Sequence, residues 1–236
     1  MSTTRAARSN HLIELLSRSD RKSLLAISEP CELVLSEVLY EPGTRARYVY
    51  FPLTGFISLI TLLDDGEGTG IEVGMAGIEG MLGSHVALGV ADAPLHALVQ
   101  GAGTALRIES AAFAAELERS ASLRRVINRY VYVLMLQMGS AAACLRFHMI
   151  GPRLARWLLM SHDRAMSDDL YLTHEFLAYM LGVRRVSITA AAGELQRGGA
   201  ITYRRGACHV VDRSLLEGAA CSCYASDKRH FARLLG

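Results

Sequence analysis

The sequence predicts an α+β protein: an N-terminal antiparallel β-roll of the jelly-roll type, a long dimerisation helix, and a C-terminal winged helix-turn-helix. Three observations predict it. Short β-branched and aromatic runs alternate with glycine and proline turns, a long apolar helical pattern follows, and a helix–glycine–helix motif with a basic hairpin comes last. The predicted divisions are a sensor domain over 1–119 with flanking helices, the dimerisation helix over 120–148, and the DNA-binding domain over 149–236. The 236 residues, 51% of them hydrophobic, exclude a disordered chain.

The β-roll is predicted from residues 31–109. Apolar residues at helical spacing over 12–29 first indicate a short helix pair, which Pro30 breaks. Predicted strands then cover 32–39, 47–51, 55–62, 70–74, 95–100 and 104–108. Turn signals separate them at Glu41-Pro42-Gly43, Pro52-Leu53-Thr54-Gly55, Asp64-Asp65-Gly66 and Gly101-Ala102-Gly103. Several short strands spaced in this way are typical of an antiparallel barrel or roll.

The dimerisation helix is predicted from Ser120 to about Phe147. Its seam follows alternating steps of four and three, as in a coiled coil, and comprises Leu123, Ile127, Tyr130, Leu134, Gln137, Ala141 and Cys144. A second apolar stripe (Val126, Val133, Leu136) indicates burial on two sides, against the roll and against a partner chain. We expect these seven seam residues to form a homodimer interface in which Gln137 fixes the register. An ordinary core helix in a monomer is the alternative.

The helix-turn-helix is predicted from residues 172–195. Thr173 can cap a first helix, and Gly182 permits the left-handed turn that ends it. A second helix begins near Arg184 or Arg185. The small residue Ala178, the glycine and the apolar Ile188 have the spacing that two crossing helices require. Two short strands, 200–203 and 207–211, then flank Arg204-Arg205-Gly206 and predict a hairpin wing.

Charge is unevenly distributed along the chain. The formal net charge is only +2, but residues 171–236 hold nine Lys+Arg against five Asp+Glu, whereas residues 1–170 hold 16 against 18. A mildly basic C-terminal end is consistent with an anionic partner there, and with the helix-turn-helix it indicates double-stranded DNA.

The order of these parts resembles the Crp/Fnr superfamily of bacterial transcription regulators. The segment Ile150-Gly151-Pro152-Arg153-Leu154-Ala155-Arg156-Trp157-Leu158-Leu159 is similar to the family's helix after the dimer helix, and 172–195 is similar to its recognition motif. The resemblance implies a cytoplasmic homodimer that reads a near-palindromic site on DNA and works with RNA polymerase.

Residue roles follow from position and from the resemblance. Arg184, Arg185, Ser187 and Thr189 lie in the first turns of the recognition helix, where side chains reach base edges or phosphates. The resemblance aligns Arg185 with the family's guanine-reading arginine. We expect phosphate contacts from Thr173, Arg204 and Arg205. Val186 and Ala190 depart from the catabolite-activator subgroup, so a ligand-binding or protein-interaction module whose helix-turn-helix no longer reads DNA is the alternative function.

The sensor part lacks the cyclic-nucleotide anchors of the family. In the cassette-like stretch from Gly77 to Val99, Met81 stands where the resemblance implies a ribose-binding Glu. No Lys or Arg occurs between Tyr48 and Leu106, so a buried phosphate would lack a charged partner. We therefore expect a small-molecule effector other than a cyclic nucleotide, or none. The candidate pocket residues are Glu79, Gly80, Met81, Gly83 and Pro94.

No cofactor, metal or enzymatic motif is predicted. Cys31 and Cys144 are isolated, and Cys221 and Cys223 form a Cys-x-Cys pair without matching partners, so we expect packing or surface thiols. His85, His96 and His148 leave haem ligation open. No nucleophile elbow, zincin or P-loop pattern occurs. The longest apolar run, 131–145, falls short of the 20 or so residues of a membrane span.

Overall fold

The computed structural model describes residues 9–63, 69–204 and 206–236, and it divides the chain into two compact units. Unit 1 comprises 1–57, 76–132 and 235; unit 2 comprises 58–75, 133–234 and 236. This boundary falls within the long helix, so the division predicted at 119 and 148 stays a prediction. The predicted turn at 64–66 and Arg205 lie outside the described residues.

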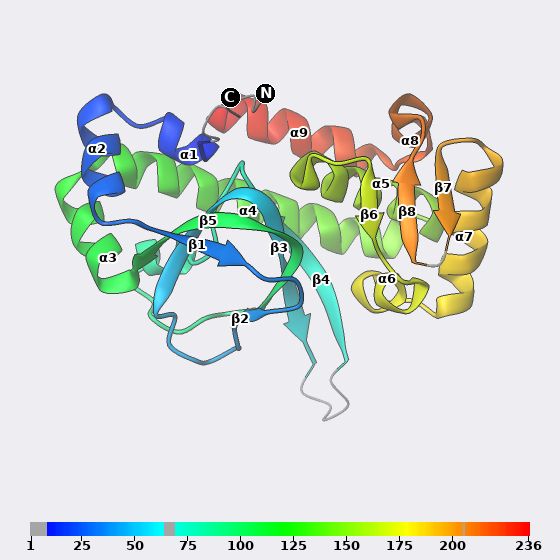
Figure 1. Ribbon diagram of the computed structural model, residues 1–236, viewed down its shortest axis with the longest axis horizontal. Coiled ribbons are helices and arrows are strands. Elements are labelled where there is room, and N and C mark those ends of the chain that lie inside the picture. Colours follow the sequence, from blue (N-terminus) through cyan, green and yellow to red (C-terminus); the bar gives the residue numbers. More distant parts are fainter. Residues whose placement is uncertain (1–8, 64–68, 205) are drawn as a thin grey trace, which may run out of the picture. The chain divides into compact units, whose positions relative to one another are not determined.

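The elements follow one another along the chain as Figure 1 labels them. They are α1 (His11–Glu14), α2 (Arg18–Ala26), β1 (Glu29–Leu33), β2 (Val38–Tyr40), β3 (Tyr48–Leu62), β4 (Gly70–Ala76), the 3-10 helix η1 (Ser84–Leu88), β5 (His96–Glu109), α3 (Ser110–Arg119), α4 (Ala121–Phe147), α5 (Ile150–Ala165), β6 (Asp169–Tyr171), α6 (His174–Leu181), α7 (Arg185–Arg197), β7 (Ile201–Arg204), β8 (Ala207–Val210), α8 (Arg213–Ala219) and α9 (Ser222–Leu235).

The N-terminal sheet has the order β1-β5-β3-β4, and β2 also pairs with β5. β1 runs antiparallel to β5, from Glu29 opposite Arg107 to Leu33 opposite Gly103. The sheet bends at Gly55, whose φ of +73° only glycine adopts readily, and a side chain there would clash with the backbone of 101–102. The core of unit 1 is apolar and includes Phe51, Val99, Ala105, Ile108 and Phe113. The predicted antiparallel β-domain is confirmed.

α4 is a continuous helix of 27 residues. In the described chain it is the one helix that is long and apolar enough for a membrane span, with a mean hydropathy of 1.2 over 18 residues. Core helices of soluble proteins meet the same criterion, so this feature alone is weak evidence for a membrane.

Unit 2 is built around α5, which packs against α7 and α8. Beside them lies an antiparallel sheet of order β6-β8-β7 (Figure 1). Trp157 of α5 is buried and donates its indole N–H to Glu72 of β4 at 2.9 Å. Ser58 donates to the other carboxyl oxygen of Glu72 at 2.6 Å. These bonds hold the β3–β4 ribbon against α5 within this unit.

Candidate nucleic-acid interface

The two helices of the helix-turn-helix begin and end where the sequence predicts. Thr173 caps α6, and its hydroxyl accepts a hydrogen bond from the Phe176 N–H at 3.1 Å. Gly182 ends α6 in the left-handed conformation, and a Cβ there would lie 2.7 Å from Ile71. Ala178 and Ile188 are buried between the helices. Small and apolar side chains at these positions let α6 and α7 cross closely.

The first turn of α7 presents two exposed arginines to solvent. Arg184 occupies the N-cap position and is exposed, and within the described chain its guanidinium has no hydrogen-bond partner. The Arg185 side chain is 69% exposed, and its Nε lies 3.9 Å from the Glu175 carboxylate, which is a loose ion pair. Ordered backbone and free guanidinium groups at a helix N-terminus suit phosphate oxygens and base edges.

The polar residues predicted beside these arginines are less available. Ser187 is half-buried. The Thr189 hydroxyl donates to the Arg185 carbonyl at 3.2 Å and lies 3.0 Å from His174 Nδ1. For Thr189 to contact a base, its hydroxyl would therefore have to give up one of these internal hydrogen bonds.

The wing lies beside the start of α6. β7 and β8 pair from Ile201 opposite Val210 to Arg204 opposite Ala207, and Gly206 turns the chain at a φ of +83°. The Gly206 carbonyl accepts from the Leu172 N–H at 2.7 Å, which fixes the wing next to the Thr173 cap. Arg204 is exposed. The structure thus brings the turn of the wing, at Gly206, beside Thr173, whereas Arg205 is not described.

Three residues of this surface, His174, Tyr203 and Val186, were missed from the sequence. The His174 ring lies 4.5 Å from the Tyr203 ring, and burial lowers the pKa of His174, as does the neighbouring charge of Arg185. Burial raises the pKa of Tyr203 to about 12. Val186, assigned no role by the resemblance, is 70% exposed on the first turn of α7. An apolar side chain there suits the methyl group of thymine, so a signal for Val186 was present in the sequence.

Comparisons with known proteins agree with this geometry. The Crp-like helix-turn-helix family matches residues 152–219. FixK2 from Bradyrhizobium japonicum superimposes with a TM-score of 0.69 at 16% identity, over 83% of this chain and 98% of its own. TTHB099 from Thermus thermophilus, a regulator of the CRP family, gives 0.66 at 21% identity, over 82% and 99%. The c-di-GMP-responsive regulator CLP of Xanthomonas campestris gives 0.65 at 17%, over 82% and 99%. No curated protein sequence matches the chain.

The chain has the Crp/Fnr fold. The fold predicted from the sequence is thereby confirmed, and residues 152–219 match the Crp-like helix-turn-helix domain.

Within this Crp/Fnr fold, the predicted dimer seam needs correction. Six of its residues are buried by their own chain: Leu123, Ile127, Tyr130, Leu134, Ala141 and Cys144. The Tyr130 hydroxyl, for example, donates to the Met81 carbonyl at 3.1 Å. Gln137 is half-buried. An amphipathic helix buries its strongest apolar stripe against its own domain first. The sequence pattern does not show whether a stripe is covered by its own chain or by a partner chain.

The predicted effector pocket also needs correction. Gly80, Met81 and Gly83 are buried in the core, where side chains at the two glycines would clash with Tyr130 and Tyr40. Pro94 is exposed, and Glu79 lines neither cavity described here. A cavity of about 520 Å³ lies elsewhere in unit 1. Its lining comprises Arg45, Ala46, Arg47, Val86, Gly89, Val90, Ala91, Glu109, Ser110, Ala111 and Ala114.

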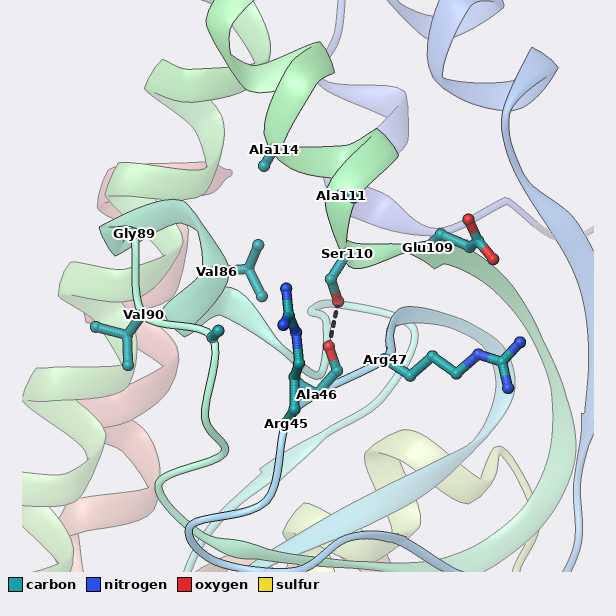
Figure 2. Close-up of a pocket in the computed structure, with 11 residues that line it drawn as sticks. Arg45, Ala46, Arg47, Val86, Gly89, Val90, Glu109, Ser110, Ala111 and Ala114 are labelled. Carbon is teal, nitrogen blue, oxygen red and sulfur yellow. Dashed lines mark hydrogen bonds between the residues drawn. The ribbon is translucent and has the colours of Figure 1, made fainter.

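Figure 2 shows how this cavity is arranged. Ser110, at the start of α3, donates to the Ala46 carbonyl at 2.7 Å. The Arg45 side chain extends toward Ser110 and Val86, whereas Arg47 points to the other side. Arg45 was not among the predicted pocket residues, because it lies just before the stretch without Lys or Arg that begins at Tyr48.

The structure contradicts two expectations about the cysteines: that Cys144 is isolated, and that the pair Cys221 and Cys223 lacks matching partners. Cys144 and His148 lie beside Cys221 and Cys223, and all four donor atoms fall within 4.8 Å of one another. Among the histidines considered for haem, His96 pairs with Glu41 at 2.9 Å and His85 packs on Tyr40. Cys31 and Cys208 take no part in the cysteine–histidine group.

Proposed function

We propose that this protein is a homodimeric transcription regulator that binds a near-palindromic operator through the major groove. The observation that carries the proposal is the pair of arginines on the first turn of α7, whose guanidinium groups are free for an external partner. Arginine presents a planar fork that matches the O6/N7 edge of guanine, and the proposal assigns this contact to Arg185. Arg184 reads a base edge or binds a phosphate.

Phosphate contacts complete the interface in this proposal. The proposal assigns these contacts to Thr173, which caps α6, to Arg204, which ends β7, and to Arg205, which follows Arg204 in the sequence. Contacts of this kind hold α7 in register on the duplex and release counterions, so affinity falls steeply with salt. Ser187 and Thr189 contribute less to DNA binding in this proposal. Ser187 is half-buried, and the Thr189 hydroxyl already donates to the Arg185 carbonyl.

The homodimer of this proposal uses the face of α4 that remains open. Exposed residues recur there in steps of three and four and comprise Asn128, Tyr132, Met135, Gly139 and Ala142. Tyr132 is 49% and Met135 64% exposed, and a Cβ at Gly139 would meet no neighbour. Such a stripe is the seam of a two-stranded coiled coil, in which the small residues let the backbones approach. Two copies then present two recognition helices to two half-sites.

The remaining parts of the proposal concern regulation. A cavity of about 520 Å³ is within the usual range for small-molecule sites, which supports an effector bound beside Arg45. RNA polymerase as partner and a cytoplasmic location follow from the regulator fold and from the proposed DNA binding.

The experiment that tests the function is a fluorescence anisotropy titration of the purified full chain against its own upstream intergenic DNA. A scrambled duplex and two salt concentrations complete the design. The double variant Arg184→Ala/Arg185→Ala should lose operator binding. Arg229→Ala/Arg233→Ala, which removes two exposed arginines from α9, is matched in charge and should bind as the wild type does.

Equal binding by the two double variants would contradict the proposal. Failure of the wild-type protein to distinguish operator from scrambled DNA, with and without a panel of effectors, would favour the alternative: a ligand-binding or protein-interaction module whose helix-turn-helix no longer reads DNA.

A further inference from the structure

Two segments far apart in the sequence bring three thiols and one imidazole together in unit 2. Cys144 and His148 lie one helical turn apart at the end of α4, where the His148 N–H still donates to the Cys144 carbonyl at 3.1 Å. Cys221 is the N-cap of α9, and Cys223 lies in its first turn. Cys144 and Cys221 are buried, whereas His148 and Cys223 are half-buried. The group is therefore built into the fold and open to solvent on one side.

The donor atoms have the spacing of a single four-coordinate ion. The Cys144 and Cys221 sulfurs lie 3.5 Å apart, and Cys223 Sγ lies 3.5 Å from His148 Nδ1. All four donor atoms lie within 4.8 Å of one another. In a tetrahedral site with Zn–S bonds of about 2.3 Å and Zn–N bonds of about 2.1 Å, donor atoms lie about 3.5–3.8 Å apart. Only small side-chain adjustments would bring the four atoms to these values.

The donor chemistry selects among metals. Three soft thiolates and one imidazole favour zinc, whereas magnesium and calcium require oxygen ligands. An iron–sulfur cluster needs space for several irons and sulfides between its cysteines, and donors this close leave room for one ion. Four protein ligands also leave no open position, which is the mark of a structural rather than a catalytic zinc site.

The surroundings balance the charge of such a site. Three thiolates and one Zn²⁺ carry a net charge of −1. Cys144 lines a small cavity of about 40 Å³ together with Arg153 and Arg156 of α5. Cations near a thiolate group stabilise the deprotonated sulfurs that bind metal.

We propose that Cys144, His148, Cys221 and Cys223 form a tetrahedral Cys₃His site for one Zn²⁺ ion. The ion fastens the end of α4 to the start of α9 within unit 2, on either side of the helix-turn-helix in the sequence. Since the unfolded chain cannot hold the four donors together, zinc binding adds directly to the stability of this unit. The inference is independent of DNA binding.

The first test uses the wild-type full chain, purified under reducing, oxygen-free conditions. Elemental analysis should find about one zinc per chain, removable by a chelator. The chelated protein should melt at a lower temperature, and Zn²⁺ but not Mg²⁺ should restore the melting temperature. Co²⁺ in place of zinc should give the charge-transfer and d–d absorption of a tetrahedral thiolate site. Zinc-free protein that melts the same with or without added Zn²⁺ would overturn the proposal, as would iron with sulfide or a Cys144–Cys221 disulfide.

The second test assigns the ligands. Cys223→Ser and His148→Ala alter half-buried residues and should weaken Zn²⁺ binding by more than about 100-fold, because even residues that only support zinc ligands change affinity by about 10–100-fold. Cys31→Ser removes a half-buried thiol outside the group and should bind zinc as the wild type does. Undiminished zinc in both ligand variants, or equal loss in Cys31→Ser, would overturn the assignment.

Discussion

The arginines of α5 and α7 have the same chemistry and opposite surroundings, although both helices belong to unit 2. On α5 they are tied to the protein: Arg153 donates to the Leu181 carbonyl, Arg156 pairs with Asp227 at 2.8 Å, and Arg164 donates to the Met160 carbonyl at 2.9 Å. On α7, Arg184 and Arg185 face solvent with no close partner.

This difference separates arginines that hold the fold from arginines that are free for a ligand. A buried guanidinium must keep its partners, because an unpaired charge in the interior is costly. An exposed guanidinium contributes little to stability and can exchange water for phosphate or guanine. Removing the carboxylate beside each helix therefore tests whether the two kinds of arginine differ in this way.

The largest effect is expected from Asp227→Ala, which leaves Arg156 buried without its counter-charge. Both side chains of this pair are about nine-tenths buried, with 12% and 10% exposed. Removing one partner of such a pair costs about 3–5 kcal/mol of unfolding free energy. Glu175→Ala removes the exposed carboxylate near Arg185 and should change stability by less than about 0.5 kcal/mol. Urea unfolding of the two variants measures both, and equal losses would remove the distinction between the helices.

A second large effect is expected at α4, which has one face buried by its own chain and another exposed to solvent. Met135→Glu places a charge on the open stripe of each copy. Burying that charge in a dimer should weaken self-association by about 3 kcal/mol or more. Met149→Glu changes a more exposed methionine outside the stripe and should leave the dimer intact. Sedimentation velocity over a concentration series measures the dissociation constant, and an unaffected dimer in Met135→Glu would exclude this face.

A smaller effect is expected from Arg185→Lys, which keeps the charge and loses the fork. Operator affinity should fall by about 1–2 kcal/mol, with relaxed preference at one base pair, because lysine binds as a point charge. The salt dependence should stay as in the wild type, since the number of charged contacts is unchanged. Titrations against single-base operator variants measure this, and a changed salt slope with intact base preference would assign Arg185 to a phosphate.

The winged domain could be predicted closely because its signals are local. Thr173, Gly182 and Ile188 each occupy a position that the crossing of two helices dictates, and neighbours in sequence provide the contacts. The antiparallel roll could be predicted as a class for the same reason, since turn residues separate its strands.

The seam of α4, the pocket and the thiol group could not be predicted, because each depends on contacts between distant segments. Helical periodicity finds an apolar stripe and cannot say whether the chain or a partner covers it. Arg45 and Ser110 both line the cavity, although they are 65 positions apart in the sequence. Cys144 and Cys221 are equally remote, and only the fold places their sulfurs 3.5 Å apart.

The last expected effect concerns Glu72, the half-buried acid that faces α5 from β4. Desolvation raises the pKa of Glu72 to about 7, against the opposing influence of the hydrogen bonds from Ser58 and Trp157 and of the cations Arg164 and Arg156. Because the folded state holds this proton more tightly than the unfolded state, stability should fall as the pH rises from about 4.5 to 7. The loss continues through the folded-state pKa of about 7 and is complete once the pH is well above it, at about 1–3 kcal/mol.

Glu72→Gln keeps both hydrogen-bond acceptor and shape, and removes the ionisable group. The difference between wild-type and variant unfolding free energies should therefore change as the pH rises through 4.5 and about 7, and become constant once the pH is well above 7. Ser58→Ala removes a bond that favours the ionised carboxylate, so it should extend the pH-dependent range upward. Parallel curves for wild type and Glu72→Gln would mean that the pKa of Glu72 is the same in the folded and in the unfolded protein. In that case Glu72 would be ionised at pH 7 beside Arg164 and Arg156, like the paired charges of α5.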